Sequence, residues 1–81
     1  MAYNYLGIAY NEKGEIEKAL DMFERSIRFD PGYSEPYYNV GLIYAKLGRL
    51  KEARDRLSKG IELGLEKEKE EKARRELGRI P

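Results

Sequence analysis

The sequence predicts an all-α fold, an α-solenoid in which antiparallel helix pairs stack on one another, with about five helices in total. Three observations support this prediction. The chain repeats itself after 34 residues, apolar residues recur at helical spacing within each repeat, and Gly or Pro stands where each helix has to end. The length of 81 residues allows one small domain.

The internal repeat is found by shifting the sequence along itself by 34 positions. The identical pairs are Tyr3–Tyr37, Gly7–Gly41, Tyr10–Tyr44, Gly14–Gly48, Ala19–Ala53, Asp21–Asp55 and Ile27–Ile61. Most of these positions hold apolar residues or Gly, which are the types that packing selects. The two units are therefore expected to share one structure.

Each unit contains two apolar stripes. Tyr3, Leu6, Gly7 and Tyr10 fall at i, i+3, i+4 and i+7, which predicts a first helix over 2–13 with these residues on its buried side. Gly14 then ends the pattern. The second stripe, which predicts a helix over 16–29, consists of Ile16, Ala19, Leu20, Phe23 and Ile27.

The second unit repeats the arrangement after a loop at Asp30-Pro31-Gly32, because Pro cannot continue a helix. Ser34 is expected to cap the next helix through its hydroxyl. The predicted helices of this unit span 35–47 and 50–63.

A further helix is predicted over 66–79, where charged helix formers dominate. Ion pairs are expected for Glu68–Lys72 and Glu70–Arg74, and the narrow apolar side consists of Leu65, Ala73, Leu77 and Ile80. The alternative is one continuous helix from Leu50 to Leu77. Gly60 and Gly64 favour a break.

Composition excludes several classes of function. The 16 basic and 15 acidic residues leave a net charge of +1, so no nucleic-acid partner is expected. No apolar run is long enough for a membrane span, and no secretory signal begins the chain, so a cytoplasmic protein is expected. Neither Cys nor His is present. We therefore expect no metal, no cofactor and no enzymatic activity.

The repeated residues resemble the tetratricopeptide repeat. The first unit shows Tyr3, Leu6-Gly7, Tyr10, Ala19, Phe23, Ser26 and Pro31, and the second shows Tyr37, Val40-Gly41, Tyr44, Ala53, Leu57 and Gly60, with Leu65 where the family has Pro. The resemblance covers 1–65. It implies a right-handed superhelix of a repeat at 1–33, a repeat at 34–65 and a capping helix at 66–81.

The physical reason for the two glycines is close helix approach. Without a side chain at Gly7 and Gly41, the second helix of each unit is expected to come close at Ala19 and Ala53. Tyr10 and Tyr44 are expected to fill the space between adjacent helices.

The resemblance also implies a concave groove that is lined by the first helix of each unit. The candidate groove residues are Asn4, Ile8, Asn11, Glu12, Tyr38, Asn39, Leu42, Lys46 and Lys69, with Ala45 on the same face. Tyr38 is the strongest candidate, as an aromatic side chain expected to be exposed. Ile8 and Leu42 have two interpretations, as ligand anchors or as ordinary packing residues.

The family's best-known groove clamps the terminal carboxylates of heat-shock chaperones. The corresponding positions here are Asn4, Ile8, Asn39, Lys69 and Ala73, of which only Asn39 and Lys69 carry a suitable side chain. A full clamp is therefore not expected.

The expected function is binding of a peptide or partner protein in the groove. The alternative is self-association with another copy, since two units are fewer than such arrays usually contain and the chain starts inside its first helix. A repeat fragment, excised or engineered, without a ligand of its own is a further alternative.

Overall fold

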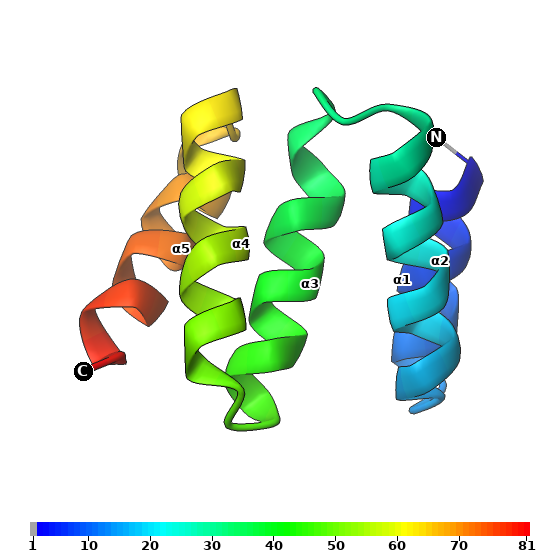
Figure 1. The fold of residues 1–81 in the computed structure, drawn as a ribbon, viewed down its shortest axis with the longest axis horizontal. Helices are drawn as coiled ribbons and strands as arrows, with labels where there is room; N and C mark the ends of the chain where they lie inside the picture. Colours follow the sequence, from blue (N-terminus) through cyan, green and yellow to red (C-terminus); the bar gives the residue numbers. More distant parts are fainter. Residues whose placement is uncertain (1) are drawn as a thin grey trace.

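The computed structural model describes residues 2–81, and that range contains five α-helices. They are α1 (Ala2–Glu12), α2 (Ile16–Phe29), α3 (Ser34–Lys46), α4 (Leu50–Leu63) and α5 (Lys67–Arg79). Helices α1 and α2 form one antiparallel pair and α3 and α4 the other, while α5 packs against α4 and α3 (Figure 1). The predicted all-α fold of antiparallel helix pairs is confirmed.

A single glycine separates α4 from α5. Gly64 follows the last residue of α4 with a φ of 102°, a conformation that side chains with a Cβ rarely adopt. The alternative of one helix from Leu50 to Leu77 is therefore wrong. Gly60 does not contribute to the break: it lies buried inside α4, where an added Cβ would stand 3.4 Å from the backbone nitrogen of Tyr38.

The start of α3 is fixed by a contact that is distant in sequence. Ser34 lies in the first turn of α3, and its hydroxyl donates a hydrogen bond to the carbonyl oxygen of Gly64 at 2.8 Å. The predicted N-cap role of Ser34 is wrong, because Tyr33 takes the cap position and makes no side-chain cap bond. Ser34 instead satisfies a carbonyl at the end of α4, which would otherwise lack an intrahelical partner.

Within each helix pair a glycine of the first helix lies in close contact with the second helix. A Cβ on Gly7 would stand 2.5 Å from the ring of Phe23, and one on Gly41 would stand 2.6 Å from Cγ of Leu57. The predicted close approach is confirmed, but its partners are Phe23 and Leu57 and not the alanines. Ala19, one turn away on the same face of α2, is fully buried.

The core has two parts. The first lies between the two pairs and contains Ala19, Phe23, Val40 and Ile43, with Ile8, Tyr10, Ile16, Leu20 and Tyr44 packed against them. The second lies under α5 and contains Tyr38, Leu57 and Ala73, with Leu42, Ile61, Leu65 and Leu77 packed against them. Tyr10 and Tyr44 thus fill space between helices as predicted, and the predicted apolar side of α5 contributes Ala73 and Leu77.

The outer face of α1 is exposed. Tyr3 and Leu6 are 38% and 46% exposed, whereas their repeat equivalents Tyr37 and Val40 are 6% and 0% exposed. The prediction that Tyr3 and Leu6 are buried is therefore wrong. Val40 is buried because α2 precedes α3 and covers it, and no described helix stands in the same position before α1.

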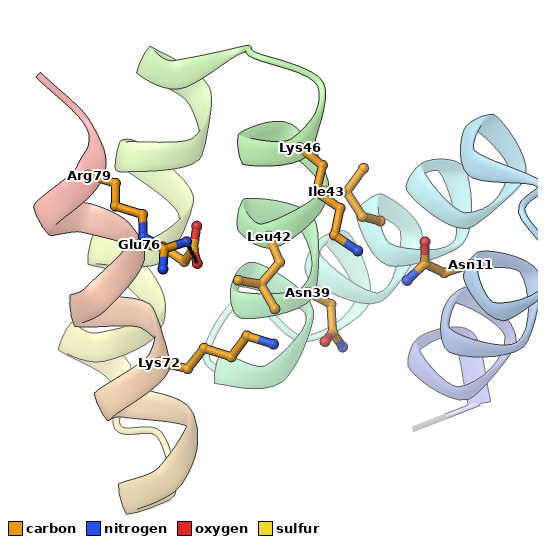
Figure 2. Close-up of a pocket in the computed structure, with 8 residues that line it drawn as sticks. All are labelled: Asn11, Asn39, Leu42, Ile43, Lys46, Lys72, Glu76 and Arg79. Carbon is orange, nitrogen blue, oxygen red and sulfur yellow. Dashed lines mark hydrogen bonds and ion pairs between the residues drawn. The ribbon is translucent and has the colours of Figure 1, made fainter.

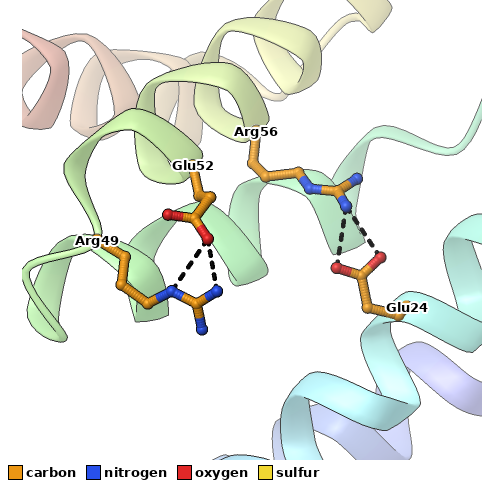
Figure 3. Close-up of polar contacts among 4 residues, drawn as sticks. All are labelled: Glu24, Arg49, Glu52 and Arg56. Atoms are coloured by element: carbon orange, nitrogen blue, oxygen red, sulfur yellow. Dashed lines mark hydrogen bonds and ion pairs between the residues drawn. The ribbon is translucent and has the colours of Figure 1, made fainter.

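A charged pair also connects the two units. Two hydrogen bonds, of 3.0 and 3.1 Å, run from a guanidinium nitrogen of Arg56 on α4 to the carboxylate of Glu24 on α2 (Figure 3). The same guanidinium lies 5.8 Å from the ring of Tyr37 on α3. Arg56 therefore contacts both helices at the boundary between the pairs. A second pair in the same region, Arg49–Glu52, lies at the start of α4, and the Arg49 guanidinium lies 4.7 Å from the ring of Tyr44 on α3.

The glycine contact predicts a clear difference between two substitutions. Gly41→Ala should lower the free energy of unfolding by about 1–3 kcal/mol, because the added methyl overlaps Leu57. Gly78→Ala on α5 adds the same methyl with no neighbouring atom within 4 Å, and should leave stability unchanged or raise it by up to about 1 kcal/mol. Urea denaturation followed by circular dichroism measures both. Equal effects would contradict the close approach at Gly41.

Candidate functional site

The first helix of each unit and α5 together border one cavity. It has a volume of about 420 Å³ and is lined by Asn11 of α1, by Asn39, Leu42, Ile43 and Lys46 of α3, and by Lys72, Glu76 and Arg79 of α5 (Figure 2). The spacing explains why these side chains share one surface. The α3 residues stand at i, i+3, i+4 and i+7, and the α5 residues at i, i+4 and i+7, so each set lies on one helix face.

The cavity combines an apolar floor with polar walls. Ile43 is 4% exposed and Leu42 is half-buried, so both present apolar surface at the base. Asn11 and Asn39 contribute side-chain amides. Arg79 is paired with Glu76 at 3.2 Å, whereas Lys46 and Lys72 are exposed and form no ion pair within residues 2–81.

Four of the predicted groove residues meet in this cavity: Asn11, Asn39, Leu42 and Lys46. Glu12 is exposed near the end of α1 but does not line the cavity. Ile8 is half-buried against the first part of the core, which agrees with the packing interpretation. Leu42 combines both interpretations, because it packs against the second part of the core and also lines the cavity.

Asn4 is a structural residue inside the fold. It is 0% exposed, and its Nδ2 donates hydrogen bonds to Glu35 at 3.3 Å and to the Tyr33 hydroxyl at 3.5 Å. Its Oδ1 accepts a bond from Nδ2 of Asn39 at 3.1 Å. The prediction that Asn4 faces the groove is therefore wrong. A buried amide needs such partners, and here they come from residues about thirty positions away in the sequence.

Lys69 extends this polar network to α5. Its Nζ lies 3.1 Å from Glu35 and 3.6 Å from Glu66. Burial lowers the pKa of Lys69, but the hydrogen bond and the charge of Glu35, together with Glu66, outweigh burial and raise the pKa above its ordinary value of 10.5. Both Asn39 and Lys69, the two positions that suited a carboxylate clamp, thus make bonds within the molecule.

Tyr38 lies beneath α5. It is 7% exposed and packs with Leu57 and Ala73, and burial raises the pKa of its phenol above 10.0. The prediction of an exposed aromatic is wrong, because α5 covers this part of α3. Removing the Tyr38 ring would therefore disturb the docking of α5 as well as any site nearby.

Lys72, Glu76 and Arg79 are cavity residues that the sequence prediction missed. From the sequence, Lys72 is expected to pair with Glu68, and none of these three residues is placed in the groove. The pair Glu70–Arg74 forms at 2.9 Å, but among residues 2–81 no ion pair joins Glu68 to Lys72. The signal was present in the sequence: adding one more period of 34 to Tyr38, Leu42 and Ala45 gives these three positions.

Two family models match the chain. A model described as TPR repeat matches residues 7–48, and a model described as Tetratricopeptide repeat matches residues 34–63.

None of the helices in residues 2–81 is long and apolar enough to cross a membrane.

Several curated proteins are similar in sequence. An uncharacterized protein of Methanocaldococcus jannaschii is 36% identical over 73% of this chain and 69% of its own length. The chloroplastic tetratricopeptide repeat domain-containing protein PYG7 of Arabidopsis thaliana is 34% identical over 54% of this chain, and BBSome complex member BBS4 of Bos taurus is 30% identical over 70% of it. The chain spans only 15% and 11% of the length of these last two relatives. A cytoplasmic location stays a prediction.

Because Asn4 is buried and Asn11 is exposed, replacing each of them with alanine should change the stability of the fold by different amounts. Asn4→Ala should lower the free energy of unfolding by about 1–3 kcal/mol, since it leaves the part-buried bonding groups of Asn39 and Glu35 without this partner. Asn11→Ala, at an exposed position of α1, should change it by no more than about 0.5 kcal/mol. Thermal unfolding of both variants tests this. A neutral Asn4→Ala would show that the network adds nothing to stability.

Proposed function

Because the chain belongs to the tetratricopeptide repeat family, we propose that it binds a peptide or a segment of a partner protein in the cavity between α1, α3 and α5. Modules of this family generally mediate protein interaction. One relative carries the name of a member of a protein complex, which agrees with a binding function.

The observation that carries the proposal is the composition of the cavity. Leu42 and Ile43 offer an apolar floor for one anchoring side chain, and the amides of Asn11 and Asn39 offer donors and acceptors of the kind that a peptide backbone needs. The volume of about 420 Å³ lies within the range of about 300–1,000 Å³ that is typical of ligand sites.

Binding suits these residues better than catalysis does. The cavity holds amides, ammonium groups and one carboxylate that is already paired with Arg79. A reaction would require a nucleophile next to a base, or an acid and a base with separate roles, and the lining residues contain no such pair. We therefore propose a non-catalytic module without a cofactor.

The proposed site can be tested by blocking it. A displayed library of random peptides, selected on the immobilised chain, should yield binders that lose at least about tenfold in affinity for Asn11→Trp, because the indole fills the cavity. Asp55→Trp places the same ring on an exposed position of α4 and should leave binding unchanged. Fluorescence polarisation measures the affinities, and circular dichroism checks that both variants stay helical.

The opposite pattern would contradict the proposal. Binders that survive Asn11→Trp but are lost with Asp55→Trp would place the site on α4. A selection that yields no specific binder would contradict peptide binding itself.

A second candidate function is association with another copy of the chain. The observation that favours it is the exposed outer face of α1, where Tyr3 and Leu6 are 38% and 46% exposed. In the second unit the equivalent side chains Tyr37 and Val40 are covered by α2 and the loop before α3. A helix pair from a second copy would cover the α1 face in the same way.

Light scattering after size-exclusion chromatography tests this second candidate. If copies associate through α1, the mass should rise with concentration, and Leu6→Glu should shift the equilibrium toward monomer because it places a charge in the contact. Leu47→Glu, at an equally exposed leucine after α3, serves as the control. A constant monomeric mass would rule the association out.

A further inference from the structure

We propose that the cavity selects an internal segment of its partner in which an apolar side chain stands between carboxylates, and that Lys46 and Lys72 bind those carboxylates. The inference rests on the proposed function, since it assigns the ligand chemistry of the same cavity. Three observations support it: the places of the lysines in the cavity, the lack of ion pairs to them, and the internal contacts of Asn39, Lys69 and Ala73, which correspond to the carboxylate clamp of the family.

The two lysines approach the apolar floor from different helices. Figure 2 shows Lys72 extending from α5 toward α3, near Leu42, and Lys46 extending from α3 into the space that faces Asn11. A leucine-sized side chain placed on Leu42 would therefore be approached by ammonium groups from two helices, α3 and α5. Carboxylates on both sides of such an anchor would meet both charges.

The side chains that line the cavity carry an excess of positive charge. Its cations are Lys46, Lys72 and Arg79, and its one carboxylate is that of Glu76. Glu76 pairs with Arg79 at 3.2 Å, and within residues 2–81 it forms no ion pair with either lysine. An anionic partner would supply the missing counter-charge, and a cationic one would be repelled.

The use of the clamp positions argues against recognition of a chain terminus. Lys69 is held by Glu35 and Glu66, Asn39 bonds to Asn4, and Ala73 is fully buried in the core. No group of cations therefore remains at these positions to surround a terminal carboxylate. The unpaired cations stand instead on two different helices that line the cavity, Lys46 on α3 and Lys72 on α5, an arrangement that fits two side-chain carboxylates along an extended segment.

Both lysines are exposed, which sets the size of the expected effect. A single solvent-exposed ion pair changes an equilibrium by up to about fivefold, and salt reduces the effect. The selectivity for an acidic segment should therefore arise from both contacts together and should be strongest at low ionic strength.

The test uses two synthetic peptides with acetylated and amidated ends, so that neither has a terminal charge. One carries a leucine with two glutamates on each side, and the other replaces the four glutamates with glutamines. Fluorescence polarisation should show the glutamate peptide binding at least about tenfold more tightly at low salt. This difference should shrink as salt is added.

Three matched variants locate the interaction. Lys46→Gln and Lys72→Gln should each weaken binding of the glutamate peptide by about fivefold and leave the glutamine peptide unaffected. Lys51→Gln removes the same charge from an exposed position of α4, outside the cavity lining, and should change neither affinity. All three positions are exposed on helices, and circular dichroism verifies that the helices are intact.

Each contrary outcome has a distinct meaning. Equal affinity for the two peptides, with both blocked by Asn11→Trp, would overturn the acidic preference and leave the proposed cavity in use. A preference for the glutamate peptide that Lys51→Gln reduces as much as Lys46→Gln would show a general charge effect and overturn the assigned residues. Failure of the chain to bind the glutamate peptide would overturn the inference, while the library selection decides the proposed function separately.

Discussion

The architecture depends on the absence of a side chain at one position in each helix pair. At Gly7 and Gly41 a single added methyl would stand 2.5–2.6 Å from Phe23 or Leu57, a distance that packed atoms do not tolerate. Because each pair closes there, Phe23 and Leu57 reach full burial and the faces of α1 and α3 that carry the cavity residues are left free of their own partner helices.

The sequence predicted local structure well because local structure depends on neighbouring residues. The bounds of α2 and α4 were predicted to the residue from apolar spacing and from Gly or Pro at the ends. Contacts between distant segments were predicted less well. From its place in the sequence Asn4 was expected to be exposed. It is buried because Glu35 and Asn39 of α3 pack against it and hydrogen-bond to its amide. Tyr38 changes in the same way, because α5 covers it.

The candidate site shows a different kind of limit. Asn11, Asn39, Leu42 and Lys46 were found because they lie on helices whose repeat was recognised. Lys72, Glu76 and Arg79 were missed because the many charged residues of α5 are typical of a helix that faces solvent. Their spacing of 34 residues from Tyr38, Leu42 and Ala45, which indicates the groove face, was not used. In the structure α5 takes the place that the first helix of a third unit would occupy against α4. Helix α5 therefore lines part of the cavity, and its side chains Lys72, Glu76 and Arg79 contribute charges to the candidate site.

This dual position of α5 couples binding to stability. One side of α5 docks through a narrow seam, in which Ala73 is fully buried and Leu77 is half-buried, while another side supplies Lys72 to the cavity. A ligand that contacts both α3 and α5 binds only when α5 is docked. By linkage, such a ligand would stabilise the docked state of α5, and this stabilisation would grow as the free ligand concentration rises above the dissociation constant. The less stable the docking of α5 is by itself, the more the order of α5 would depend on such a ligand.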